Sequence, residues 1–176
     1  MMVFSLLRPG ALLVQRLVLW IGRRRRSSTK LSELSLIHFA RLALIRRFPD
    51  HGQEPDELPQ PLELFESNYD GTFDGYIDSF VDSVPWDMRG FWATSYGFPW
   101  RLALAQFERY IHANEFATGA IDHYYVAYPE ATVKMIGSAL RVVEMNTQFR
   151  QRALQSDDQD FAADYQAFLT ELQADL

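Results

Sequence analysis

The sequence contains no cysteine among its 176 residues, which excludes disulfide bonds, thiolate metal ligands and thiol nucleophiles. This absence leaves the redox compartment open, because it removes only one reason to expect secretion. The sequence also lacks a glycine-rich phosphate loop after a strand and a G-x-S-x-G turn, so neither nucleotide binding nor serine hydrolysis is indicated. It does contain 48% hydrophobic and 14% aromatic residues, a composition typical of a folded domain.

Acidic residues are missing from the first 30 positions, which hold seven Lys and Arg. The other 146 residues hold ten Lys and Arg and all 23 Asp and Glu, a net charge of −13. Such asymmetry indicates that the N-terminal segment has its own electrostatic role. The acidic remainder argues against nucleic acid as a partner.

The apolar segment 11–21, ALLVQRLVLWI, is about half as long as a bilayer-spanning helix. Its arginines follow the apolar run, whereas a secretory signal places cations before it. We therefore expect a helix that lies in an anionic membrane interface. The alternative is a helix that docks into a groove on a protein partner. Eight residues are expected to make the contact: Leu12, Leu13, Leu17, Trp20, Arg23, Arg24, Arg25 and Arg26.

Apolar periodicity and turn residues predict the remaining elements. Strands are expected at 37–45, 62–69, 89–96 and 121–128. Helices are expected at 73–84 after a Thr72 cap, at 100–114 with Leu104 buried, at 132–149 and at 157–172. The segment 49–61 holds four prolines and is expected to be an exposed loop, and Asp70-Gly71 is expected to be a turn with Gly71 at positive φ.

These elements predict an α+β fold of the ferredoxin-like kind, with a four-stranded sheet and helices on one face. The expected divisions are an N-terminal helical arm at 1–30, the α+β domain at 31–155 and a C-terminal helix packing on it at 156–176. A sheet covered on one side leaves an apolar face exposed. We therefore expect the chain to form a homodimer.

The string Leu64-Phe65-Glu66-Ser67-Asn68-Tyr69-Asp70-Gly71, followed by Tyr76-Ile77-Asp78-Ser79-Phe80, resembles a bacterial family with an SNYDG…YIDDF-like pattern. Three further segments occur in the same order as in that family: His38-Phe39-Ala40-Arg41, Gly97-Phe98-Pro99 and Tyr125-Val126-Ala127-Tyr128-Pro129. The resemblance implies no established activity. It implies a ferredoxin-like fold of the dimeric α+β-barrel type, which dye-decolorising haem peroxidases also use. Their G-x-x-D-G motif resembles residues 67–71, with Ser67 in place of the first Gly.

Three residues are weak candidates for catalysis: Asp70, from that motif, and the histidines His112 and His123. A histidine can serve as an axial haem ligand or as a general base. No second histidine, however, lies at H-x-x-x-H-type metal-binding spacing from either of them. Asp70, Asp74, Asp78 and Asp82 recur every four residues, which is more typical of the solvated edge of a helix than of a metal site. No metal or other cofactor is expected.

The sequence thus favours a non-catalytic accessory or binding protein, cytoplasmic and either peripheral to the membrane or bound in a complex. One alternative is a small haem-binding or oxidative enzyme of the α+β-barrel type. A second is a carrier of lipid or another hydrophobic ligand, which would use the dense aromatic residues between Phe65 and Trp100.

Overall fold

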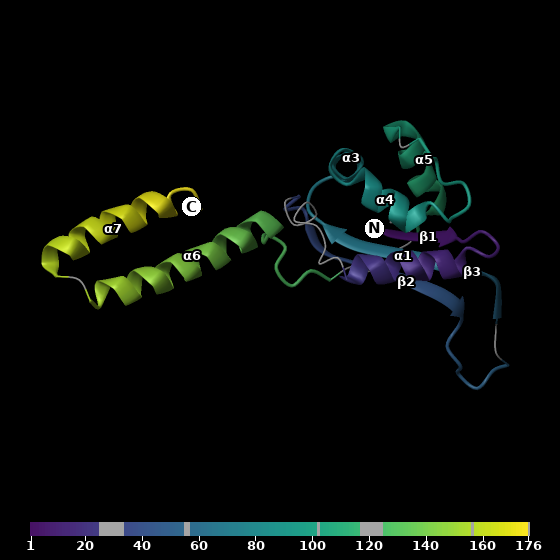
Figure 1. Ribbon diagram of the computed structural model, residues 1–176, viewed down its shortest axis with the longest axis horizontal. Coiled ribbons are helices and arrows are strands. Elements are labelled where there is room, and N and C mark those ends of the chain that lie inside the picture. The colour runs from purple at the N-terminus through teal and green to yellow at the C-terminus, as the bar shows by residue number, and fades with distance from the viewer. Residues whose placement is uncertain (25–33, 55–56, 102, 117–124, 156, 176) are drawn as a thin grey trace. The chain divides into compact units, whose positions relative to one another are not determined.

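The computed structural model describes residues 1–24, 34–54, 57–101, 103–116, 125–155 and 157–175 (Figure 1). The chain forms an α+β structure that divides into two units, residues 1–126 and 127–176. In the described part of the chain, the first unit contains a three-stranded antiparallel sheet with four helices, and the second contains two helices. Among the described residues, no helix combines the length and the apolarity needed to cross a bilayer.

The sheet has the strand order β1-β3-β2, with β1 at Met2–Leu6, β2 at Ile37–Arg47 and β3 at Glu57–Tyr69. Both neighbouring pairs are antiparallel, so β1 and β2 run in the same direction on either side of β3. Helix α1, Leu12–Arg24, lies between β1 and β2 in the chain. The result is a split β-α-β arrangement.

Strand β1 belongs to the segment that we expected to be a separate arm. Val3 pairs with Phe65 of β3, and both Val3 and Leu7 are fully buried. The outer edge of β1 is also bridged, by Glu115 at Val3 and by Ser95 at Leu7. The first residues are therefore an integral part of the sheet and not an appendage.

The predicted loop at 49–61 is too long, because β3 begins at Glu57 and includes Pro59 and Pro61. Proline cannot donate a ladder hydrogen bond, so it is confined to places where the ladder is open. This end of β3 extends past β1, whose last paired residue is opposite Leu62. Its pairing with β2 is irregular there too. The strand predictions at 37–45 and 62–69 are confirmed, within longer strands.

The turn and helix after β3 agree with expectation. Gly71 has φ +89°, and α3 spans Phe73–Ser83 with the Thr72 hydroxyl accepting from the Gly75 N–H. Tyr76 and Phe80 are buried on the inner side of this helix.

The strand predicted at 89–96 is wrong, because α4 spans Pro85–Trp92. Proline at the first helical position starts a helix readily, and Val84, Met88 and Trp92 are buried at intervals of four residues. Aromatic content had indicated a strand, but the four-residue spacing of the buried side chains forms a helical stripe.

The helix predicted at 100–114 begins later, since α5 spans Leu104–Asn114, and Leu104 itself is exposed. Phe107, Tyr110 and Ile111 are the buried residues of this helix. Residues 121–124 of the last predicted strand lie outside the described residues, and 125–128 are not in a strand. A four-stranded sheet is therefore not found in the described part of the chain.

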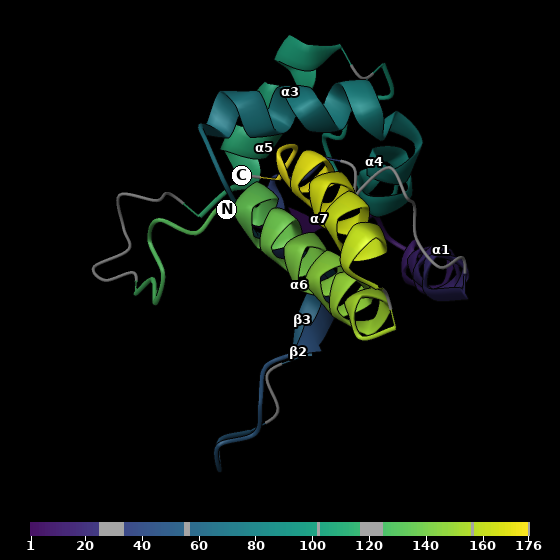
Figure 2. The same cartoon turned by 90° about the vertical axis from the view of Figure 1, so that its left-hand side faces the viewer.

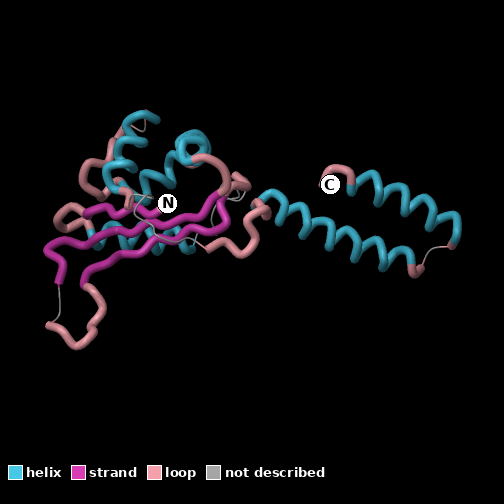
Figure 3. The backbone as a smooth tube through the Cα atoms, turned by 180° about the vertical axis from the view of Figure 1, so that it is seen from behind, coloured by secondary structure: helices cyan, strands magenta, loops and turns pink. Residues whose placement is uncertain are grey.

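The core surrounds Trp92, whose ring contacts those of Phe65 and Phe107 at centroid distances of 5.0 and 5.7 Å. Phe65 belongs to the sheet face that the helices cover, and Trp92 and Phe107 pack onto that face from α4 and α5. In Figure 1, α1 is in front of the strands, and Figure 3 shows the strands from behind, where no described helix of this unit covers them. The uncovered face carries Phe4, Leu62 and Leu64, which are half-buried, and Leu6 and Phe39, which are exposed.

The second unit is a helical hairpin of α6, Val133–Ala153, and α7, Asp158–Leu172, which lie side by side in Figures 1 and 2. The rings of Phe149 and Phe168 stack at 4.8 Å, and Arg141 donates to Asp175. Thr132 caps α6, because its hydroxyl accepts from the Met135 N–H. Ile136, Leu140 and Val143 on α6 remain exposed.

One carboxyl group lies in the core of the first unit. Glu63 is fully buried, and within the described part of the chain neither of its oxygens has a hydrogen-bond partner. It lies opposite Ser5, whose hydroxyl accepts from Tyr110. Burial raises the pKa of Glu63 to about 8 and that of Tyr110 to about 12, so both groups are neutral near neutral pH.

Glu63 makes the stability of this unit depend on pH. Because its folded pKa lies above the usual value of 4.5, folding favours the protonated form, and stability falls as the pH rises from about 4.5 to about 8. Glu63→Gln should remove most of this loss, which is on the order of 4 kcal/mol. Denaturant unfolding at pH 5 and pH 8.5 measures it, with Glu66→Gln on the same strand as the control. Parallel pH profiles for the parent and Glu63→Gln would contradict the assignment.

Candidate functional site

Helix α1 is oriented by a polar residue in its middle. Gln15 is fully buried, although it interrupts an apolar run. Its Nε2 donates to the carbonyl oxygens of Gly90 and Phe91, at 3.3 and 2.7 Å. Its Oε1 accepts from the Thr94 hydroxyl at 2.7 Å. Because Gly90 and Phe91 lie in the last turn of α4, their carbonyls have no partner within that helix. Gln15 therefore supplies the hydrogen-bond donors that these carbonyl oxygens at the end of α4 lack within their own helix.

The two helices also approach closely beside this contact. A Cβ atom added at Gly90 would lie 3.5 Å from Val18 Cγ1, so side chains of α1 pack almost directly on the α4 backbone. Together with the Gln15 hydrogen bonds, this packing fixes which side of α1 faces inward.

The opposite side of α1 is apolar and exposed. Leu13, Leu17 and Trp20 are 74%, 56% and 50% exposed, and with Arg24 they follow the spacing of one helical stripe. The Arg24 guanidinium lies over the Trp20 ring at 4.2 Å. We call the residues Leu13, Leu17, Trp20 and Arg24 the outer stripe.

The outer stripe contains most of the described residues that the sequence predicted for membrane or partner contact. Leu12 is the exception, because it is half-buried on the inner side. The side chain of Arg23, and Arg25 and Arg26 entirely, lie outside the described residues. Arg16, which the sequence analysis did not select, is exposed on the same helix.

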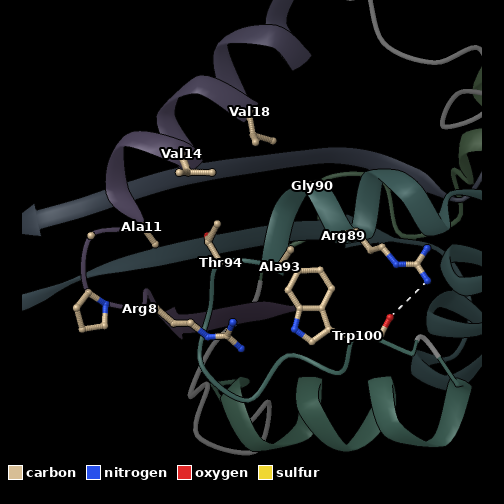
Figure 4. Close-up of a pocket in the computed structure, with 11 residues that line it drawn as sticks. Arg8, Ala11, Val14, Val18, Arg89, Gly90, Ala93, Thr94 and Trp100 are labelled. Carbon is tan, nitrogen blue, oxygen red and sulfur yellow. Dashed lines mark hydrogen bonds between the residues drawn. The ribbon is translucent and has the colours of Figure 1, made fainter.

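A groove runs between the N-terminal half of α1 and α4 (Figure 4). It has a volume of about 500 Å³ and is lined mainly by apolar groups, including Val14, Val18 and Ala93. Two arginines, Arg8 and Arg89, also line it, and its described lining contains no acidic residue. In Figure 4 the ring of Trp100 lies between these two arginines. This groove was not predicted from the sequence, because its walls come from separate segments.

The candidate catalytic residues have other partners. His38 Nε2 lies 2.8 Å from Asp70 Oδ1, and His112 Nδ1 lies 2.8 Å from Glu115 Oε1. The His112 ring also packs against Phe73, at 4.7 Å between centroids. His123 lies outside the described residues. None of the groups that line the groove is among these candidates.

The predicted aromatic cluster divides between core and surface. Phe65, Tyr76, Trp92 and Phe98 are buried, so they fill the core, whereas Trp100 is 62% exposed and lines the groove. In the described part of the chain, no group of three or more His, Asp or Glu side chains could hold a metal ion.

Comparison of the chain with protein-family models, with curated proteins and with solved structures finds no match in any of the three. The resemblance to the bacterial SNYDG family therefore stays a prediction.

The Gln15 contacts can be tested through stability. Gln15→Leu should preserve the side-chain size but leave two carbonyls and one hydroxyl without this partner, at a cost of about 3 kcal/mol. Arg16→Leu is the matched control, because its side chain is exposed one position along, and it should change stability by less than about 0.5 kcal/mol. Chemical denaturation compares the two variants. Equal stabilities would show that Gln15 does not hold α1 on α4.

Proposed function

We propose that the protein is a non-catalytic binding protein that associates peripherally with anionic membranes through the outer stripe of α1. The observation that carries this proposal is the inverted pattern of that helix, which buries Gln15 and exposes Leu13, Leu17 and Trp20. Exposing three large apolar side chains to water is unfavourable, whereas the same side chains are stabilised at the boundary between head groups and acyl chains.

The charges near the stripe support the same partner. Arg16 and Arg24 are exposed on α1, and basic side chains at an anionic surface contribute about 1 kcal/mol each. Trp20 is suited to the membrane interface, because its ring has an apolar body and a polar N–H. The alternative occupant is a protein groove with an acidic rim.

A ferredoxin-like fold and self-association complete the proposal. The order β1-β3-β2 with α1 between β1 and β2 is the one found in the first half of that fold. The bridges from Ser95 and Glu115 lie on the outer edge of β1, where that fold has its fourth strand. We also infer a homodimer through the open sheet face, because its apolar residues can cover the same residues of a second copy.

Membrane binding is tested by sedimentation with vesicles. The full-length protein should bind phosphatidylglycerol vesicles more strongly than phosphatidylcholine vesicles, and added salt should weaken the binding. Leu13→Ser/Leu17→Ser should reduce the bound fraction at least tenfold, because each change removes buried apolar area at the interface.

The matched control is Leu140→Ser/Val143→Ser, which changes two exposed apolar residues of α6. This variant should bind as the parent does. If the α6 variant loses binding and the α1 variant keeps it, the outer stripe is not the membrane-contacting surface.

Self-association is tested by light scattering on the full-length protein. The parent should have the mass of a dimer, and Leu6→Glu/Phe39→Glu should be monomeric, because two charges would be buried without partners in the interface. Both residues are exposed in the single chain, so neither change should lower the stability of a monomer substantially. A monomeric parent protein at high concentration would contradict the dimer.

A further inference from the structure

We propose that the groove between α1 and α4 binds the phosphate head group and the first acyl carbons of one anionic lipid molecule. This proposal deepens the membrane-binding function and rests on it. It names a second kind of contact, in which a single lipid is held between two helices while the outer stripe lies in the bilayer.

The charge of the groove selects an anion. Arg8 and Arg89 both line it, and neither forms an ion pair within the described part of the chain. Arg89 is held in place, because it donates to the Trp100 carbonyl at 3.4 Å and lies over the Trp86 ring at 4.8 Å. Two guanidinium groups present planar sets of donors that match phosphate oxygens.

The remaining walls select an acyl chain. Val14 and Val18 point from α1 toward α4 in Figure 4, and Ala93 directly follows the end of α4. The Trp100 ring adds an apolar surface between the two arginines. A volume of about 500 Å³ falls within the range of small-molecule sites. Free phosphate would fill only the charged end of this space.

The positive end of the α1 dipole adds to the attraction. The helix begins at Leu12, next to the groove residues Pro9, Gly10 and Ala11, and no acidic residue occupies its first turn. Backbone N–H groups at a helix start favour a nearby anion. This contribution is secondary to that of the two arginines.

The test is calorimetric titration of the full-length protein, without vesicles, with decyl phosphate below its micellar concentration. Inorganic phosphate and decanol are titrated in parallel, since each carries one half of the chemistry. Decyl phosphate should bind at least tenfold more tightly than either. Equal binding of inorganic phosphate would show a simple anion site, and equal binding of decanol would show that the arginines take no part. Both results overturn the proposal, as does a parent protein that binds none of the three.

Two pairs of variants assign the head-group contact. Arg8→Gln/Arg89→Gln should bind decyl phosphate at least tenfold more weakly than the parent, and Arg8→Lys/Arg89→Lys should retain most of the affinity because it keeps both charges. Arg109→Gln is the control, because Arg109 is exposed on α5 and does not line the groove, and this variant should bind within twofold of the parent. Melting curves identify any variant that has lost its fold. If a folded Gln pair binds as the parent does, the groove assignment is wrong.

The outer-stripe variant separates this proposal from the membrane-binding function. Leu13→Ser/Leu17→Ser should bind decyl phosphate as the parent does while losing vesicle binding. Decyl phosphate binding in a protein that never sediments with vesicles would overturn the membrane function alone. Vesicle binding without decyl phosphate binding would overturn the groove alone.

Discussion

The hydrogen bonds of Gln15 determine which side of α1 faces the core of the first unit and which side is exposed. A helix rich in leucine and valine would ordinarily turn those side chains toward the core. Here the end of α4 leaves two carbonyls that need donors, and the Gln15 amide supplies both of its hydrogens to them. Leaving such buried groups unpaired costs about 1–3 kcal/mol each. That cost outweighs burying one more leucine, so the polar residue faces inward.

Two surfaces follow from this one orientation of α1. Turning Gln15 inward places Leu13, Leu17 and Trp20 on the outer side, and it places Val14 and Val18 on the side that faces α4. The outer stripe and the groove are therefore neighbouring sides of a single helix. A rotation of α1 that buried Leu17 would remove Gln15 from α4 and change the walls of the groove. The two proposed lipid contacts thus depend on the same hydrogen bonds.

The sequence predicted elements whose signals are local. Thr72 caps α3 and Gly71 adopts positive φ because cap and turn preferences act within a few residues. It failed at 89–96, where aromatic content favoured a strand but Pro85 and the spacing of Met88 and Trp92 produce a helix. It could not place residues 1–7 in the sheet, because β1 pairs with a strand about 60 residues away. Of the leucines predicted for contact, Leu13 and Leu17 are exposed on α1 and Leu12 is half-buried, whereas the groove depends on Arg89 and Trp100, which only the fold brings beside α1.

The charge asymmetry of the chain gains a physical meaning from these surfaces. Outside the first 30 residues the net charge is −13, so an anionic bilayer repels most of the protein. At physiological salt this repulsion acts within about 8 Å, and on α1 the exposed Arg16 and Arg24 accompany the exposed apolar residues of the outer stripe. If the protein binds a membrane as proposed, these arginines favour the orientation in which the outer stripe meets the bilayer. The groove opens along the same helix, and its described lining contains no acidic residue. A lipid that left the bilayer beside α1 would therefore reach Arg8 and Arg89 without passing a carboxylate of the groove.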